Sequence, residues 1–150
     1  MPSGESSPTG ETSERSILSC SVVICTRDRP ERLEQCLEAV ARLDYPRVDA
    51  LIVDNAPSDS RTRDLAARRG VRYLVEPLPG LSRARNRGAR ACETEIVAFL
   101  DDDAIPEPDW LSALAAEFMD PLVMAVAGRV RPFSGIAPVN QRSGKTCRVH

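Results

Sequence analysis

Residues 17–25 (ILSCSVVIC) form a nearly continuous apolar run that is rich in β-branched side chains. A strand with apolar residues on both faces must be covered on both faces, which is typical of a parallel sheet between two layers of helices. Shorter runs of the same kind recur at residues 50–53, 71–75, 96–100 and 123–130. This repetition restricts the chain to folds that are built around a central sheet.

Segments with the periodicity of amphipathic helices separate these apolar runs. After Pro30, a residue suited to the first turn of a helix, Leu33, Leu37 and Val40 recur at the spacing of one buried stripe. Strands that alternate with helices of this length predict βαβ units, and therefore an α/β fold with a mainly parallel sheet. The other expected helices run from Ser58 or Asp59 to Ala67, with Gly70 as a stop, from Leu81 to Cys92, and from Pro108 to Phe118.

The two ends of the chain lack this pattern. Residues 1–15 are rich in Ser, Gly, Thr, Pro and Glu, so we expect a disordered tail there. Periodicity is lost again over residues 133–150, where we expect an irregular tail, which leaves one domain over residues 16–132. A net charge of −2 gives this domain no overall bias toward nucleic acid.

Cellular location can be inferred from the cysteines and from the apolar runs. No run approaches the roughly 18 residues of a membrane-spanning helix, and the N-terminus lacks the basic-then-apolar order of a signal peptide. The five cysteines are odd in number and have no CxxC spacing, which favours a reduced, cytoplasmic protein. Peripheral attachment to the inner face of the membrane stays open. His150 is the only histidine, so we expect no histidine-based catalytic or zinc site.

Three consecutive carboxylates, Asp101, Asp102 and Asp103, directly follow the apolar run 96–100. Like charges this close raise one another's pKa unless a cation neutralises them. Such a cluster at the end of a buried strand is a candidate site for a hard divalent cation with oxygen ligands. A solvated acidic turn that caps the next helix is the alternative.

Polar residues also follow the other expected strands. Thr26 and Arg27 come after the first strand, Asp54 and Asn55 after the second, and Glu76 after the third. In an open α/β sheet the carboxyl ends of the strands form the edge at which ligands bind. We therefore expect these residues to converge with the aspartates on a single site.

The segment 80–88 (GLSRARNRG) adds positive charge to the same edge. A helix N-terminus attracts anions through its free amides, and Arg83 and Arg85 lie in the first turns of the expected helix. Arg87 and Arg90 are expected on its solvated outer face. Carboxylates, a cation and nearby arginines together suit a bound diphosphate, because the cation bridges phosphate oxygens and arginine offsets the remaining charge.

Taken in order, these motifs resemble the family 2 glycosyltransferases with the GT-A fold. The resemblance implies a Rossmann-like, three-layer GT-A domain that binds a nucleotide diphosphate sugar. It also implies a hexosyltransferase-type reaction in which the sugar passes to an acceptor hydroxyl with inversion; a glycan, a lipid carrier and a small molecule all stay open as acceptors. The matching segments are 21–29 (SVVICTRDR), 52–56 (IVDNA), 80–88, 98–103 (AFLDDD) and 108–111 (PDWL), within about residues 19–132.

The resemblance implies roles for individual residues at the nucleotide. Thr26 and Asp54 match positions that contact the base, and Arg83 or Arg85 lies in the segment that flanks the diphosphate. Asp102 or Asp101 would contact the ribose. The nucleotide-sugar-binding residues expected in this way are Thr26, Arg27, Asp54, Asn55, Arg83, Arg85 and Asp102.

The resemblance also implies a metal site. Asp101 and Asp103 match the two ends of the DxD motif and would hold Mn²⁺ or Mg²⁺, with Asp103 as the direct ligand. The cation would act as a Lewis acid on the departing diphosphate.

No residue of the chain matches a general base, so the catalytic residue is unknown. A base must lie within hydrogen-bond reach of the attacking hydroxyl. After Asp109 the only acids are Glu117 and Asp120, which we expect on or just after a helix remote from the ligand edge. Family members usually carry the acceptor site in a second half, which we expect to be missing here. A truncated donor-binding fragment without activity is therefore an alternative.

A second alternative is an α/β phosphoryl-transfer protein with an acidic metal site. Such folds place a key Asp at the end of the first strand, where this chain has Thr26 and Arg27. Asp28 is the residue that keeps this alternative open.

Overall fold

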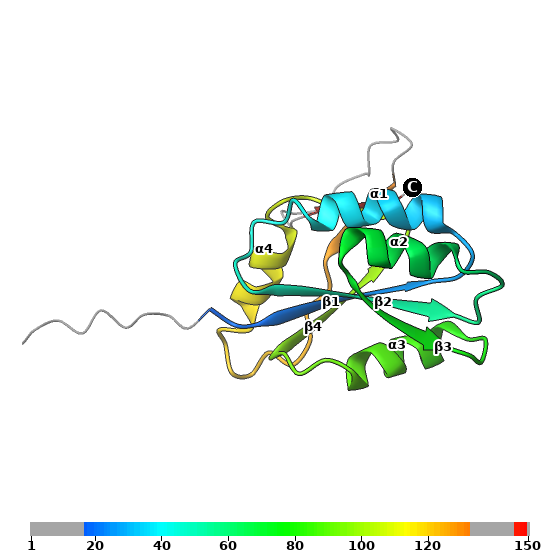
Figure 1. The fold of residues 1–150 in the computed structure, drawn as a ribbon. Helices are drawn as coiled ribbons and strands as arrows, with labels where there is room; N and C mark the ends of the chain where they lie inside the picture. The colour runs from blue at the N-terminus through cyan, green and yellow to red at the C-terminus, as the bar shows by residue number, and fades with distance from the viewer. Residues whose placement is uncertain (1–16, 133–145, 150) are drawn as a thin grey trace, which may run out of the picture.

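A computed structural model of the chain describes residues 17–132 and 146–149. Its centre is a four-stranded sheet in the order β3-β2-β1-β4, with every neighbouring pair parallel (Figure 1). This arrangement confirms the predicted α/β fold. The strands are β1 (Cys20–Thr26), β2 (Val48–Asn55), β3 (Arg72–Glu76) and β4 (Ile96–Asp101).

Strand β1 lies in the interior of the sheet, as its apolar sequence predicts. All seven of its residues are buried, because β2 and β4 flank it and helices cover both of its faces. The strand begins at Cys20 rather than at Ile17, which is half-exposed and lies outside the ladder. It continues to Thr26, whose backbone pairs with that of Asp54.

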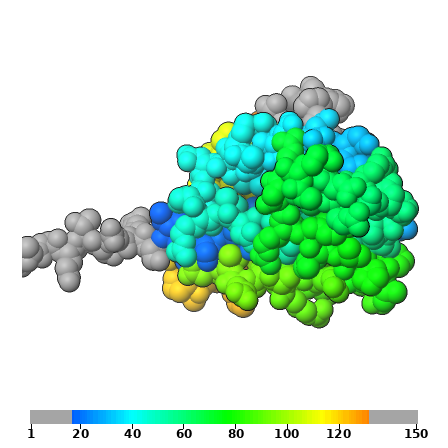
Figure 2. Space-filling model, in the orientation of Figure 1, coloured from blue at the N-terminus to red at the C-terminus, as the bar shows by residue number. Residues whose placement is uncertain are grey.

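Helices cover the sheet on both faces. Figure 1 shows α1 (Pro30–Val40) and α2 (Arg61–Arg69) on one face of the sheet and α3 (Leu81–Arg90) on the other. Helix α4 (Trp110–Glu117) shares a core with α1 and α2. In the space-filling view little of β1, which is coloured blue, reaches the visible surface (Figure 2).

Alternate residues of β1 supply the two cores. Val22 and Ile24 belong to the core under α1, α2 and α4, whereas Val23 and Cys25 belong to the core under α3. Successive side chains of a strand point to opposite faces, so one strand contributes to both layers. Burial on both faces is the physical reason for the continuous apolar run.

Glycine lets α3 approach the sheet closely. A Cβ added at Gly88 would collide with Cγ1 of Val23 on β1. The last glycine of the 80–88 segment is therefore required for helix–sheet packing. At the other end of the segment Gly80 has a φ of 142°, a backbone conformation that side chains disfavour.

The start of α2 differs from the prediction. Its N-cap residue is Ser60, not Ser58 or Asp59. Ser58 is engaged elsewhere, because its backbone N–H and its hydroxyl both donate to Asp28. Gly70 adopts the left-handed conformation at the end of this helix, as predicted.

A second, three-stranded sheet was only partly predicted. It has the order β5-β7-β6, built from β5 (Ala104–Pro106), β6 (Arg129–Pro132) and β7 (Thr146–Val149). The strand expected over residues 123–130 forms only from Arg129 onward, and β7 lies where an irregular tail was expected. These strands are three or four residues long, too short to carry a clear alternation pattern. The tail predicted over residues 1–15 lies outside the described residues.

None of the helices within residues 17–132 combines the length and the hydropathy that a membrane-spanning helix requires.

Candidate functional site

The carboxyl ends of β1, β2 and β4 lie next to one another, as expected. Thr26 on β1 is paired in register with Asp54 on β2, and Cys25 with Asp101 on β4. The sheet therefore brings Thr26, Asp54 and the three consecutive aspartates to a single edge. We refer to this group, Thr26, Asp54 and Asp101–Asp103, as the carboxyl edge.

The three aspartates after β4 face different partners. Asp101 is 60% exposed and accepts a hydrogen bond from Arg85 Nη2 at 3.1 Å. Asp103, which is 20% exposed, lies 3.4 Å from Arg32 Nη1 and 3.9 Å from Arg29 Nη1. Asp102 is fully buried. Within residues 17–132 and 146–149, no group of three or more acidic, histidine or cysteine side chains converges to hold a metal ion.

Asp102 is a structural link between the first and fourth strands. The Thr26 hydroxyl donates to its Oδ2 at 2.6 Å, and Arg29 Nη2 lies 2.7 Å from its Oδ1. Burial raises the pKa of Asp102, while the Thr26 hydrogen bond and the Arg29 charge lower it. Oδ2 of this carboxylate is therefore hydrogen-bonded, and Oδ1, which has no hydrogen-bond partner among the described groups, lies in an ion pair with Arg29.

Asp54 is also fully buried, but it has only one partner. The Tyr73 hydroxyl donates to its Oδ2 at 2.9 Å, and its Oδ1 has no hydrogen-bond partner among the described groups. Burial raises the pKa of Asp54, and the Tyr73 hydrogen bond opposes that rise. Buried polar atoms in native proteins are usually hydrogen-bonded, so an orphaned carboxylate oxygen at a ligand edge indicates a missing donor.

Asn55 organises the loop before α3. Its side-chain oxygen accepts a hydrogen bond from the Gly80 backbone N–H at 2.8 Å. Its amide donates to the backbone oxygen of Leu78 at 2.8 Å and more weakly to that of Glu76 at 3.4 Å. The side chain expected to bind the nucleotide therefore holds the turn from which α3 starts.

The arginines at this edge differ in their engagement. Arg85 is held by Asp101, whereas exposed Arg83 makes no hydrogen bond or ion pair with another described residue. Arg27 is more than half exposed and lies 3.9 Å from Asp28. Arg83 is thus a cation without an ionic partner among the described residues, whereas Arg27 is paired with Asp28.

Asp28 links two loops of the site. Its φ is 54°, and its Oδ1 accepts hydrogen bonds from the Ser58 N–H at 2.8 Å and the Ser58 hydroxyl at 2.9 Å. These bonds lower the pKa of Asp28. They tie the loop after β1 to the loop after β2, so this carboxylate has a structural use.

The sequence motifs did not predict three residues that take part in this site: Arg29, Arg32 and Tyr73. The two arginines lie one turn apart at the start of α1, a spacing that could have indicated a shared anionic neighbour. Tyr73 belongs to no sequence motif, and its hydrogen bond to Asp54 follows only from the register of β2 and β3.

The accessible donor set suits a hard cation that binds a diphosphate at the same time. Asp101 and Asp103 offer carboxylate oxygens, the ligands that Mg²⁺ and Mn²⁺ prefer. They supply too few ligands for a cage made by protein alone, which fits a cation that completes its shell with phosphate oxygens and water. In the structure these carboxylates form ion pairs with Arg85 and Arg32.

Comparison with known proteins gives a consistent assignment. The family model "Glycosyl transferase family 2" matches residues 21–146, beyond the segment expected from the motifs. An uncharacterized glycosyltransferase of Mycobacterium tuberculosis is 39% identical over 103 residues, which are 69% of this chain and 46% of the relative. The chain thus spans about half the length of the curated relatives it matches.

Solved structures agree with this result. A mannosyltransferase from Pyrobaculum calidifontis in complex with GDP-Man and Mn²⁺ is 26% identical, with a TM-score of 0.67 over 77% of this chain and 35% of that chain. TarS from S. aureus in complex with UDP-GlcNAc shares the fold at 20% identity, with a TM-score of 0.65 over 82% of this chain and 37% of that chain. The chain therefore belongs to glycosyl transferase family 2 and has the GT-A fold.

Proposed function

We propose that the chain binds a nucleotide diphosphate sugar at the carboxyl edge and transfers the sugar to an acceptor hydroxyl. The transfer is metal-dependent, of hexosyl type and inverting. The observation that carries this proposal is the placement of an unsatisfied buried acceptor, Asp54 Oδ1, on the same sheet edge as two accessible carboxylates flanked by arginines.

Asp54 is the proposed contact to the base. Its Oδ1 can accept a hydrogen bond but has nothing to donate in the ionised state. Uracil and guanine each present an imino N–H, whereas cytosine and adenine present a bare ring nitrogen at the corresponding position. UDP-GlcNAc and GDP-Man in the two similar structures carry these two imino bases, which supports this choice.

The proposed diphosphate site lies between β4 and α3. Asp101 and Asp103 would hold Mn²⁺ or Mg²⁺, and the cation would supply Lewis-acid stabilisation of the departing diphosphate. Arg83 lies free at the start of α3 and would pair with a phosphate oxygen, while Arg85 would exchange Asp101 for phosphate. Since Thr26 and Arg29 already engage the carboxylate of Asp102, the more exposed Asp101 is the better placed of the two to contact the ribose.

The remaining expected residues support the site. Thr26 fixes Asp102, Asn55 fixes the loop before α3, and the exposed Arg27, which is paired with Asp28, would add positive charge at the base side. The phosphoryl-transfer alternative has no support in the site, because Asp28 is engaged by Ser58.

A second candidate function is donor binding without transfer. Among the described residues, Glu117 and Asp120 are the acids after Asp109. Glu117 is the last residue of α4 and Asp120 follows it, and this helix lies toward the amino ends of the strands (Figure 1). A base must reach the acceptor hydroxyl at the carboxyl edge. This observation favours a chain that binds the donor and needs a base from elsewhere.

Isothermal titration calorimetry with UDP, GDP and CDP, each with and without Mn²⁺, tests the proposal. We expect binding of UDP or GDP that strengthens with Mn²⁺, and weaker binding of CDP. No binding of any nucleoside diphosphate under either condition would refute it. Release of UDP from a UDP-sugar in the presence of candidate acceptors separates transfer from binding alone.

A further inference from the structure

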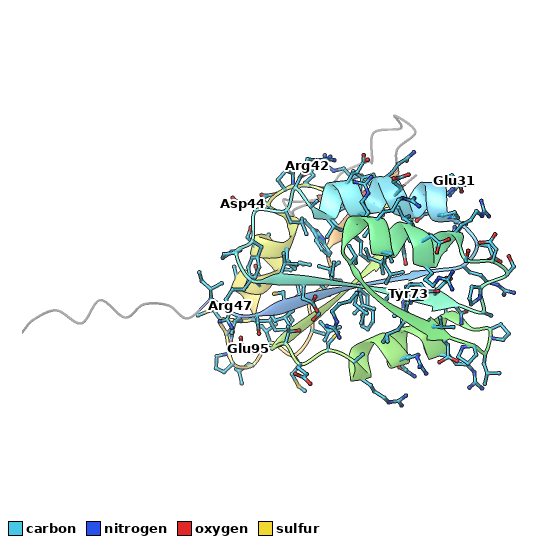
Figure 3. The ribbon with its side chains drawn as sticks, in the orientation of Figure 1. Glu31, Arg42, Asp44, Arg47, Tyr73 and Glu95 are labelled. Atoms are coloured by element: carbon cyan, nitrogen blue, oxygen red, sulfur yellow. The ribbon has the colours of Figure 1, made fainter. Side chains whose placement is uncertain are left out.

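We infer that Tyr73 is a positioning residue that fixes the carboxylate of Asp54 for recognition of the nucleotide base. This inference rests on the proposed function and concerns the same site. Tyr73 lies on β3, the edge strand beside β2 (Figure 3). Its hydroxyl is the one hydrogen-bond donor to the side-chain carboxylate of Asp54 within the described part of the chain.

The register of the sheet places the two side chains on one face. Ile52 of β2 pairs with Tyr73 of β3, and Asp54 lies two residues further along β2 on the same side as Ile52. Tyr73 packs against the core that contains Ile52. Its ring therefore lies one step behind Asp54, and its hydroxyl reaches the carboxylate from the neighbouring strand.

The hydrogen bond selects which oxygen faces a ligand. The terminal torsion of an aspartate is broad, so an unrestrained carboxylate can turn about it. The Tyr73 hydroxyl holds Oδ2 at 2.9 Å and leaves Oδ1 without a partner. A base N–H then meets one acceptor at a fixed position. Without the hydroxyl, the same binding event would first have to order the carboxylate.

The charges around the pair make the hydroxyl important for ionisation as well. Asp28, from the loop after β1, and Asp59, from the loop after β2, raise the pKa of Asp54 in addition to burial, and Tyr73 opposes them. Tyr73 itself faces Arg63 and Asp64 of α2, and burial raises its pKa to about 12, so it stays protonated and can donate.

Calorimetry with UDP and GDP in the presence of Mn²⁺ tests this role on three variants: Tyr73→Phe, Asp54→Ala and the double variant. The chain offers a matched control, because its other tyrosine, Tyr45, donates its hydroxyl to the Leu18 backbone oxygen at 2.6 Å and its substitution Tyr45→Phe removes the same group. We expect Tyr73→Phe to weaken binding about 3- to 10-fold, the effect of one hydrogen bond. Tyr45→Phe should leave the affinity unchanged.

Two readouts separate positioning from general support of the fold. If Tyr73 acts through Asp54, the double variant binds UDP as Asp54→Ala does, because the two effects are not additive. The affinity for inorganic pyrophosphate with Mn²⁺, which has no base, should be the same in Tyr73→Phe as in the unaltered chain. The acid-side loss of UDP binding should move to higher pH in Tyr73→Phe, since the carboxylate loses a donor that favours its ionised form.

The possible outcomes are distinguishable. Unchanged UDP affinity in Tyr73→Phe, full additivity with Asp54→Ala, or an equal loss of pyrophosphate affinity would each overturn the role of Tyr73 and leave the proposed function standing. Absence of UDP and GDP binding by the unaltered chain would overturn both.

Discussion

Asp102 and Asp54 are equally buried, but the partners of their carboxylate oxygens differ. Each is 0% exposed at the carboxyl edge, and burial raises the pKa of each. One oxygen of Asp102 accepts a hydrogen bond from Thr26, and the other, which has no hydrogen bond, lies in an ion pair with Arg29 at 2.7 Å. Oδ1 of Asp54 has neither a hydrogen bond nor an ion pair among the described groups. Burial of a carboxylate therefore does not distinguish structure from function at this edge, but the presence or absence of a charged partner does.

This difference separates a supporting carboxylate from one that can accept a hydrogen bond from a ligand. Between β1 and β4, Asp102 joins the strand ends and the start of α1. Between β2 and β3, Asp54 is held by Tyr73 and keeps Oδ1 without a partner among the described groups. Substitutions at the two positions should therefore change different measured quantities.

The largest effect should follow from Asp102→Ala. The change leaves the buried Thr26 hydroxyl without its acceptor and the half-exposed Arg29 without its counter-ion. We expect a loss of about 2–4 kcal/mol in the free energy of unfolding, measured by urea denaturation. Asp120→Ala, at an exposed position after α4, is the control. A loss below about 1 kcal/mol would show that Asp102 is not the link described here.

Asp54→Ala should have a small effect on stability and a large effect on the affinity for UDP. The unfolding free energy should change by about 1 kcal/mol or less, because one oxygen has no partner to lose and removal of the carboxylate relieves its desolvation. The affinity for UDP should fall about 10- to 100-fold without disappearing, as expected for one hydrogen bond to a charged group. Calorimetry and denaturation of the same preparation measure both quantities. A large loss of stability with unchanged UDP affinity would show that Asp54 has a structural role and does not bind the base.

Asp103→Asn should separate metal dependence from base recognition. We expect the strengthening of UDP binding by Mn²⁺ to disappear, because the amide is a poorer ligand for a hard cation. Binding of UDP without metal should persist through Asp54. The test is calorimetry with and without Mn²⁺, with Asp120→Asn as the control. Retention of the full Mn²⁺ effect would exclude Asp103 as a ligand.

The smallest expected effect is on the pH dependence of the free energy of unfolding. The folded-state pKa of Asp54 is raised above its ordinary value of 3.8, so the folded chain binds its proton first as the pH falls. Protonation of this carboxyl group therefore contributes stability that is fully present below pH 3.8 and is lost as the pH rises through the raised folded-state pKa. Asp54→Ala should flatten that part of the profile above pH 3.8, as measured by urea denaturation at several pH values. An unchanged profile would show that Asp54 titrates normally.

Much of the fold could be predicted because burial on both faces leaves a visible pattern. Val23 and Ile24 pack into opposite cores, and that requirement makes the β1 sequence nearly continuously apolar. The convergence of Thr26 with Asp54 then follows from the parallel topology.

The finer arrangement of the site could not be predicted. The three consecutive aspartates look alike in sequence, and only the turn after β4 directs Asp102 inward while Asp101 stays exposed. The bond from Tyr73 to Asp54 requires the register in which Ile52 lies opposite Tyr73, and apolar pattern alone does not specify that register. Strand β7 forms by pairing with the distant β5, a contact that no local signal announces.

The most direct test of this account is an NMR titration of the isotopically labelled chain with UDP, first with Mg²⁺ and then with paramagnetic Mn²⁺. We predict that UDP with Mg²⁺ shifts the backbone amide signals around Asp54, and that Mn²⁺ broadens those of residues 101–103 most strongly, with broadening that declines along β4 toward Ile96. Broadening centred elsewhere in the chain, or UDP shifts that leave the end of β2 unchanged, would contradict a donor site at the carboxyl edge.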